Sequence, residues 1–205
     1  MKIGIFGGTF DPPHFGHLIL AAEALDQLKL DRLLFVLTAD PPHKQGRHMT
    51  AIEDRLALLK AALVDNPAFE LSRVDIDRPG PHYTVDTVQL LREQHPGAEL
   101  TYLMGGDSMR NLLIDWHKPD EFVEACDFIG VMRRPQDYID VEVLEAQIPG
   151  LKNKVLFMDA PLLEISSHQI RERAASGRPY RYYLPRAVYD IICQHRLYQT
   201  SDCVN

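Results

Sequence analysis

Short apolar segments alternate along the chain with longer segments in which apolar residues recur at helical spacing. The short segments are rich in β-branched and aromatic residues, which is typical of strands buried on both faces, and they span residues 3–6, 33–37, 100–104, 128–132 and 155–158. Four other segments each place apolar residues on one helical face: Leu18, Ala22, Leu25 and Leu28; Ile52, Leu56, Leu59 and Leu63; Val85, Val88 and Leu91; and Val188, Ile191 and Ile192. This alternation predicts an α/β fold.

The predicted strands are joined by helical segments, so we expect a doubly wound, Rossmann-like parallel sheet with helices on both faces. Neither an internal repeat nor a low-complexity linker divides the chain, and a single domain over residues 1–205 is therefore predicted. Within it, residues 185–205 are expected to form a small C-terminal helical cap. Residues 133–148 have the weakest pattern and are interpreted as an acidic surface loop with a short helix.

The composition is that of an ordinary globular protein, with 45% hydrophobic and 25% charged residues and a formal net charge of −7. An acidic chain repels a phosphate backbone, so no nucleic-acid partner is expected, although cations gathered in one pocket would still bind a small anion. No apolar run approaches the roughly 18 residues of a membrane span. The chain opens on a strand-like segment, and its cysteines lack C-x-x-C spacing, so we predict a cytoplasmic protein.

A turn rich in glycine, proline and histidine connects the first predicted strand to the first helix: Gly7-Gly8-Thr9-Phe10-Asp11-Pro12-Pro13-His14-Phe15-Gly16-His17. Ligands of doubly wound sheets bind at the carboxyl ends of the strands, where a helix N-terminus offers N–H groups to phosphate. Gly7 and Gly8 are expected to allow tight turns, and Gly16 to leave room for phosphate. His14 and His17 are three residues apart on one helical face, so both imidazoles can reach a single phosphate.

Two alternatives to phosphate binding exist for this histidine pair. The imidazoles could pack or form hydrogen bonds within the loop, or they could bind zinc. Neither a helical H-E-x-x-H motif nor a nearby cysteine accompanies them, which disfavours zinc. The dinucleotide pattern G-x-G-x-x-G and the P-loop pattern G-x-x-x-x-G-K-[ST] are both absent from the sequence.

Two segments have the S/T-x-x-E/Q spacing of a capping box. Thr50 and Glu53 predict the start of the second helix, and Ser166 and Gln169 predict the start of another. At the latter, the free N–H groups, the serine hydroxyls and the guanidinium of Arg171 would form a second anion site. The alternative there is a well-capped helix with a solvated arginine.

Candidate acceptor-binding residues lie elsewhere in the chain. Trp116 has polar and turn-forming neighbours, which favours a loop site that can stack on a flat ring over simple core packing. Tyr83 and Thr84 fall where the third helix should start, and its N–H groups suit a carboxylate. Asp107 follows Gly105 and Gly106, a position typical of a helix N-cap.

The turn that contains both histidines resembles the signature of the HIGH-type nucleotidylyltransferases, which share an α/β fold with class I aminoacyl-tRNA synthetases. Within that superfamily the chain resembles, nearly end to end, the bacterial nicotinate-nucleotide adenylyltransferases. The further segments that carry this resemblance are Pro42-His43-Lys44, Tyr83-Thr84-Val85-Asp86-Thr87, Gly105-Gly106-Asp107-Ser108, Trp116, Arg134-Pro135 and Ile165-Ser166-Ser167-His168-Gln169-Ile170-Arg171.

The resemblance implies an enzyme of NAD biosynthesis that transfers the adenylyl group of ATP to nicotinate mononucleotide, with Mg²⁺ accompanying ATP and no protein-bound metal site. Direct in-line displacement at the α-phosphorus would release pyrophosphate and form nicotinate adenine dinucleotide. The residues implied in catalysis are His14, His17, Lys44 and Arg171. Those implied in ATP binding are Gly7, Gly8, Thr9, Phe10, Gly16, Gly105, Asp107, Arg134, Ile165, Ser166 and Ser167. Those implied in acceptor binding are Tyr83, Thr84 and Trp116.

One departure and two rival functions accompany this interpretation. His168 stands where the family commonly has a small residue such as threonine, so a hydroxyl contact does not carry over to this position. A phosphopantetheine adenylyltransferase would share the two-histidine turn, but Thr84, Trp116 and the segment Ser166–Arg171 favour the nicotinate enzyme. A nucleotide-binding sensor without turnover is disfavoured by the presence of Lys44 and Arg171 beside both histidines. The sequence leaves the oligomeric state open.

Overall fold

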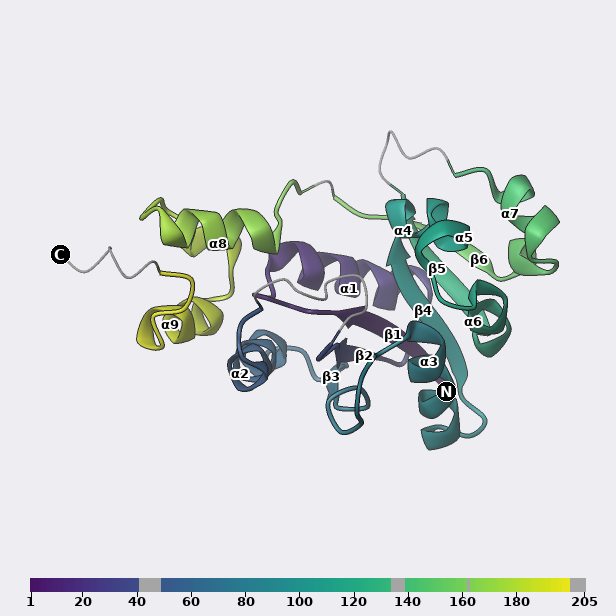
Figure 1. Ribbon diagram of the computed structural model, residues 1–205, viewed down its shortest axis with the longest axis horizontal. Helices are drawn as coiled ribbons and strands as arrows, with labels where there is room; N and C mark the ends of the chain where they lie inside the picture. Colours follow the sequence, from purple (N-terminus) through teal and green to yellow (C-terminus); the bar gives the residue numbers. More distant parts are fainter. Residues whose placement is uncertain (41–48, 134–138, 162, 200–205) are drawn as a thin grey trace.

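The computed structural model describes residues 1–40, 49–133, 139–161 and 163–199. Within them, six strands form one parallel sheet in the order β3-β2-β1-β4-β5-β6 (Figure 1). The strands are β1 (Lys2–Gly8), β2 (Arg32–Leu37), β3 (Phe69–Ser72), β4 (Glu99–Gly105), β5 (Phe128–Arg133) and β6 (Val155–Asp159). The order reverses between β1 and β4, which confirms the predicted doubly wound sheet and creates a crevice at the carboxyl ends of these two strands.

The strand β3 was not among the predicted strands. It lies at the edge of the sheet, where β2 is its one partner among the described strands, and all four of its residues are partly exposed. Its sequence includes Glu70 and Ser72 and so lacks the continuous apolar run of the buried strands. An edge strand with one solvated side gives too weak a pattern to be recognised from four residues.

Each predicted helix forms, and several short ones are added. The helices are α1 (Phe15–Gln27), α2 (Ile52–Leu63), α3 (Thr84–Gln94), α4 (Gly106–Arg110), α5 (Leu112–Asp115), α6 (Pro119–Ala125), α7 (Val141–Gln147), α8 (Ser167–Ala175) and α9 (Arg186–Gln194). Two 3-10 turns accompany them within the described residues, η2 (Leu151–Asn153) and η3 (Arg181–Tyr183). The helix α7 is the short helix expected within residues 133–148, of which 134–138 lie outside the described residues.

The helices cover both faces of the sheet, as predicted. Ile3 and Ile5 of β1 point to one face, where they share a core cluster with side chains of α3, α4, α5, α6 and α7. Phe6 points to the other face, where it packs with residues of α1 and α2. Side chains that alternate along β1 thus contact two helical layers, one on each side of the sheet.

The buried face of α1 matches the predicted one only in part. Leu18, Leu25 and Leu28 are partly buried and pack against the core, whereas Ala22, which was assigned to the same face, is exposed; the fully buried residues are Leu20, Ala21 and Ala24. This helix carries apolar residues on most of its circumference, so its periodicity does not select a single face. In α3 the predicted apolar residues are all buried: Val85, Val88 and Leu91.

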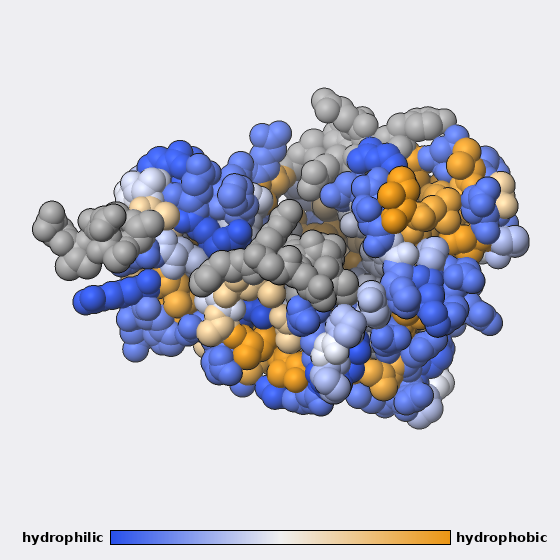
Figure 2. All heavy atoms as spheres, in the orientation of Figure 1, coloured by the Kyte–Doolittle hydropathy of each residue, from blue (hydrophilic) through white to orange (hydrophobic). Residues whose placement is uncertain are grey.

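A third apolar cluster joins the C-terminal helices to α2. Its buried members come from α2, α8, α9 and the segment before α9: Leu58, Ala62, Ile170, Leu184, Val188 and Ile192. Figure 1 shows α8 and α9 beyond the α1 and α2 end of the sheet, far from α5, α6 and α7. Figure 2 shows apolar side chains gathered over α5 and α7, where Leu113, Ile114 and Val143 are exposed. No described helix has the length and apolar character needed to cross a membrane.

Candidate active site

The connection from β1 to α1 lies at the carboxyl end of the central sheet. Gly7 and Gly8 are the last residues of β1 and have no left-handed backbone angles, so the expectation that they form a tight turn was wrong. Their use is close packing, because a Cβ atom at Gly7 would lie 2.9 Å from the Tyr102 hydroxyl oxygen. Phe10 takes the left-handed conformation instead, with a φ of 44°. Its side chain is buried in the core, so it can offer a ligand only backbone groups.

The two histidines stand together at the start of α1. Their rings stack with centroids 3.7 Å apart and an interplanar angle of 26°. The His14 backbone N–H donates to Nδ1 of His17 at 3.2 Å, which places the hydrogen of a neutral His17 ring on Nε2. A Cβ atom at Gly16 would lie 3.0 Å from His14 Nδ1 and 3.8 Å from the Ile165 carbonyl oxygen. Gly16 therefore makes room for the His14 ring beside residue 165.

The His14 side chain is buried, with 6% of its surface exposed. Burial lowers the pKa of His14 from 6.5 to about 4, so its ring is neutral at neutral pH. Its Nδ1 atom is buried and has no hydrogen-bond partner in the described part of the chain. A buried polar atom without a partner costs about 1–3 kcal/mol, which a ligand at this point would offset.

The N-terminus of α8 meets the same turn. Ser166 forms the predicted capping box, and α8 begins at Ser167 as expected. The Ser167 hydroxyl donates to the carbonyl of Pro12 at 2.8 Å, and Nη1 of Arg171 donates to the carbonyl of Asp11 at 2.6 Å. Two helix N-termini, two imidazoles and a guanidinium are therefore gathered at one place, a combination suited to a phosphate group.

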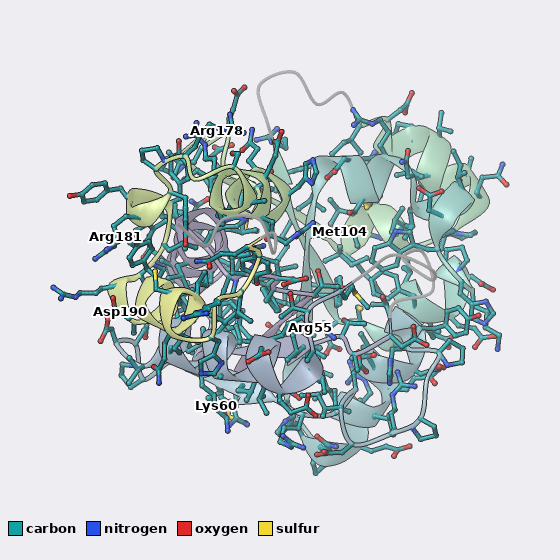
Figure 3. The ribbon with its side chains drawn as sticks, turned by 60° about the vertical axis from the view of Figure 1, so that its left-hand side comes forward. Arg55, Lys60, Met104, Arg178, Arg181 and Asp190 are labelled. Carbon is teal, nitrogen blue, oxygen red and sulfur yellow. The ribbon has the colours of Figure 1, made fainter. Side chains whose placement is uncertain are left out.

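Arg55 of α2 supports this turn, and the sequence reasoning missed it. Its side chain is 2% exposed and donates to four backbone carbonyls, at distances of 2.9–3.3 Å, in Thr9, Thr38, Ala39 and Thr50. Burial lowers the pKa of Arg55, while the negative charge of Asp11 opposes this shift. The sequence did hold a signal for this residue. Arg55 lies three and four residues before Leu58 and Leu59, which places it on the buried face of α2, and a charged residue on such a face needs hydrogen-bond partners. Figure 3 shows Arg55 in the interior, away from the peripheral Arg178 and Arg181.

The carboxylate of Asp11 explains why the predicted capping box of α2 was wrong. Asp11 is buried, and its carboxylate accepts the Tyr198 hydroxyl at 2.7 Å and the Thr50 N–H at 3.2 Å. The N-cap of α2 is Ala51, without a side-chain cap. A partner distant in sequence thus binds the chain just before α2, and the local pattern of Thr50 and Glu53 is not used.

A cavity of about 650 Å³, here called the central cavity, lies in the crevice between β1 and β4. It is bounded by the ends of these strands and by the starts of α3 and α4. The predicted site residues that line it are Gly7, Gly8, Thr9, Tyr83, Thr84, Asp107 and Trp116. The predicted site residues thus form two groups, one at the histidine turn and one around the central cavity. The end of β1 connects them, because it lines the cavity and leads into the turn.

One end of the central cavity is formed by the start of α3. Tyr83 is the N-cap of this helix, as expected, so the first N–H groups from Thr84 onward lack partners within the helix. The Tyr83 ring stacks on that of His117 with centroids 4.0 Å apart. Trp116 is half-buried and packs edge-on against Tyr102 at 5.8 Å, yet it also lines the cavity. Its two predicted roles, packing and presenting a flat ring, are therefore compatible.

Asp107 was interpreted as the N-cap of the next helix, and this was wrong. The N-cap of α4 is Gly105, because the helix begins directly where β4 ends. Asp107 lies in the first turn, is exposed and lines the cavity. A Cβ atom at Gly105 would lie 2.5 Å from Asp107 Oδ1, so this glycine leaves space for the carboxylate.

Buried polar residues that the sequence reasoning missed form another wall of the central cavity. The Thr87 hydroxyl donates to Asp75 at 2.7 Å, and Nη2 of Arg78 donates to the same oxygen at 3.0 Å. His82 Nδ1 accepts the Asp40 N–H at 3.0 Å. These bonds compensate the buried Asp75 charge and tie the segment before α3 to the end of β2.

Two predicted site residues are placed neither at the histidine turn nor in the central cavity, and neither is His168, the residue that departs from the family pattern. Lys44 and Arg134 lie outside the described residues. His168 is exposed on the first turn of α8.

A family model described as cytidylyltransferase-like matches residues 5–173, so the chain belongs to the cytidylyltransferase-like class of proteins. A protein of Thermomicrobium roseum called "Probable nicotinate-nucleotide adenylyltransferase" is 44% identical over 203 residues, which cover 99% of this chain and 94% of that one. The nicotinate-nucleotide adenylyltransferase of Bacillus subtilis is 42% identical, with 97% of this chain and 99% of that chain covered. The chain belongs to the nicotinate-nucleotide adenylyltransferase family.

Solved structures agree on the fold. Nicotinic acid mononucleotide adenylyltransferase of Plasmodium falciparum, complexed with NaAD, superposes with a TM-score of 0.78 at 18% identity and covers 96% of this chain and 97% of that chain. The same enzyme complexed with APC gives a TM-score of 0.73 at 19% identity, with 96% of each chain covered. These structures confirm the predicted α/β fold, and the two bacterial relatives confirm the predicted family.

Proposed function

We propose that the protein transfers the adenylyl group of ATP to nicotinate mononucleotide, forming nicotinate adenine dinucleotide and pyrophosphate. The observation that carries this proposal is the convergence of two helix N-termini on the stacked histidines, beside a cavity that ends at a third helix N-terminus. An anion with several phosphates fits the first part, and a smaller carboxylate-bearing ring fits the second. Family membership supports the same assignment.

The triphosphate of ATP is assigned to the junction of α1 and α8. Nε2 of His17 carries a hydrogen that can be donated to a phosphate oxygen, and the partnerless Nδ1 of His14 lies on the ring stacked against it. Arg171 uses Nη1 to bind the Asp11 carbonyl, which orients its guanidinium and leaves other N–H groups for phosphate. The roles of Lys44 and Arg134 in ATP binding stay predictions.

The acceptor is assigned to the central cavity. Its carboxylate would accept hydrogen bonds from the first N–H groups of α3, next to Tyr83 and Thr84. The flat pyridine ring would contact the rings of Tyr83 and Trp116, which line the cavity. This arrangement directs the acceptor phosphate toward the end of β1 and hence toward the triphosphate.

The chemical step is an in-line displacement. An acceptor phosphate oxygen attacks the α-phosphorus of ATP, the bond to the bridging oxygen of the β-phosphate breaks, and pyrophosphate leaves. The attacking oxygen is already ionised, so no general base is required. The protein contributes alignment and stabilisation of the charge that develops on the phosphates.

Mg²⁺ is assigned to the substrate, as MgATP. The described residues contain no group of three or more His, Cys, Asp or Glu side chains that could hold a metal ion. The carboxylate of the turn, Asp11, is already bound to Tyr198 and Thr50. A site of this composition suits a cation that is held mainly by triphosphate oxygens and water. When bound, it would neutralise charge on the leaving pyrophosphate.

The test is a comparison of acceptors. The protein is mixed with ATP and Mg²⁺ and with nicotinate mononucleotide, nicotinamide mononucleotide or phosphopantetheine, and pyrophosphate release is followed. We expect the fastest release with nicotinate mononucleotide. Turnover with phosphopantetheine alone would support the other adenylyltransferase, and ATP binding without any turnover would support a sensor. The cytoplasmic location stays a prediction.

A further inference from the structure

Asp11 is a point at which three segments distant in sequence meet. Its carboxylate accepts the Tyr198 hydroxyl and the Thr50 N–H, and its carbonyl accepts Nη1 of Arg171. Asp11 precedes His14, the N-cap of α1, by three residues. These bonds therefore determine where the histidine turn lies and how the Arg171 guanidinium is oriented.

Tyr198 reaches Asp11 from the segment that follows α9. Arg196 and Tyr198 both adopt left-handed backbone conformations, with φ of 54° and 64°, and the Leu197 N–H donates to the Ile192 carbonyl at 3.0 Å. Non-glycine residues adopt this conformation at a cost, so other contacts must hold the segment folded back on the molecule. Burial and the negative charge of Asp11 raise the pKa of Tyr198, so its hydroxyl stays protonated and donates.

Arg55 also holds this turn, through hydrogen bonds to the carbonyls of Thr9 and Thr50. Arg55 binds backbone carbonyls of the turn, whereas the Tyr198 hydroxyl donates to the Asp11 side chain, at Oδ1. Its removal would leave a buried carboxylate oxygen without this partner, and the turn would shift to find another.

We propose that Tyr198 is a positioning residue for adenylyl transfer, which acts through Asp11 on the turn that carries His14 and orients Arg171. The inference rests on the proposed function. Tyr198 and Asp11 are not among the residues that line the central cavity. The effect should therefore fall on the triphosphate and on the chemical step, and it should leave acceptor binding unchanged.

The test is Tyr198→Phe, which keeps the ring and removes the donor. We expect kcat to fall roughly tenfold, because displaced donors stabilise the developing charge less well, with the KM for nicotinate mononucleotide unchanged within about twofold. Calorimetric affinity for ATP that carries a methylene group in place of the α,β-bridging oxygen should fall about fivefold. The matched control is Tyr182→Phe, since Tyr182 is 88% exposed, and it should match the wild type in all three.

A purely structural role predicts a different result. It would lower the thermal midpoint of Tyr198→Phe and leave kcat per folded molecule, both KM values and analogue affinity unchanged, which would overturn the inference. Adding Tyr198→Phe to Asp11→Ala should change kcat and analogue affinity by less than about twofold, because the partner of the hydroxyl is already gone. If the effects of the two substitutions multiply, as independent effects do, the inference is overturned. If Asp11→Ala does not fold, the single variant decides.

The two proposals fail in different ways. If the wild type releases no pyrophosphate with nicotinate mononucleotide, the proposed function fails, and the analogue titration still tests Tyr198. If the wild type turns over and Tyr198→Phe equals it in kcat and analogue affinity, only the positioning role fails.

Discussion

His14 and His17 show how one stacked pair supplies two different imidazoles. The backbone bond to Nδ1 of His17 fixes the tautomer of that ring. Burial keeps the His14 ring neutral instead, and its Nδ1 atom lacks a protein partner among the described residues. The neutral form of His17 therefore keeps a hydrogen on Nε2 that can be donated to phosphate.

The His17 side chain is expected to contribute to turnover. His17→Ala should lower kcat by about 10²–10³, the usual effect of removing one preorganised donor to developing charge. Steady-state pyrophosphate release measures it, and circular dichroism checks that the variant is folded. A folded variant with near-normal turnover would remove His17 from the mechanism.

The buried His14 should make stability depend on pH. The unfolded chain takes up a proton near pH 6.5, whereas folded His14, with its pKa lowered to about 4, does not. Stability therefore falls as pH falls, by about 2 kcal/mol between pH 8 and pH 5, and the loss is complete below pH 4. Urea unfolding at pH 8 and at pH 5 measures the change in stability. The wild type should show this contribution, and His14→Gln should lack it. The exposed His168→Gln should retain it, and equal pH dependence in the wild type and His14→Gln would contradict the assignment.

At the scale of elements, the site consists of helix N-termini at the carboxyl edge of the sheet. The starts of α1 and α8 meet at the histidine turn, and those of α3 and α4 border the central cavity. Each start offers backbone N–H groups and the positive end of a helix dipole. An acidic protein can thus offer anionic substrates local hydrogen-bond donors despite its net charge of −7.

The start of α3 should distinguish an acid from an amide. A carboxylate accepts bonds from the N–H groups after Tyr83, whereas an amide NH₂ pointed at them would lack a partner, at a cost of about 1–3 kcal/mol. We expect kcat/KM for nicotinate mononucleotide to exceed that for nicotinamide mononucleotide by at least roughly tenfold. Trp116→Ala should harm both acceptors, since stacking does not separate them. Equal values for the two mononucleotides, or a preference for the amide, would refute this account of the cavity.

At the scale of the whole molecule, α2 links the sheet to the C-terminal helices. Leu59 of α2 packs in the cluster against the sheet, and its neighbour Leu58 packs against α8 and α9. Arg55 on the same helix holds the histidine turn. A single helix therefore couples the sheet, the site and the C-terminal segment that supplies Tyr198.

This coupling predicts one cooperative unit over residues 1–205. Ile192→Ala, at a fully buried position, should destabilise the protein by about 2–5 kcal/mol. Its urea transitions by circular dichroism and by fluorescence of Trp116, the only tryptophan, should shift together. Val64→Ala, at a 74% exposed position, should stay within about 0.5 kcal/mol of the wild type. A separate early transition that leaves the Trp116 signal unmoved would make the C-terminal helices an independent domain.

Local patterns predicted much of the fold. Five strands, the helices with strong periodicity and the capping box at Ser166 depend on residues near one another in sequence, and all of them form. The failures came where a pattern was weak or had a distant competitor. The edge strand β3 is too short and too polar to stand out, and Asp11 takes the backbone N–H of Thr50 ahead of α2.

The sequence by itself determined five of the described strands, the strongly periodic helices and the glycine- and histidine-rich turn between β1 and α1, because periodicity, capping and motif spacing are local properties. Only the tertiary structure decided which groups support that chemistry. The stacking of His14 on His17, the four carbonyls bound by Arg55 and the bond from Tyr198 to Asp11 depend on how segments up to 187 residues apart come together. A buried polar group takes whatever partner the packed chain brings within reach, and no local pattern records which one that will be.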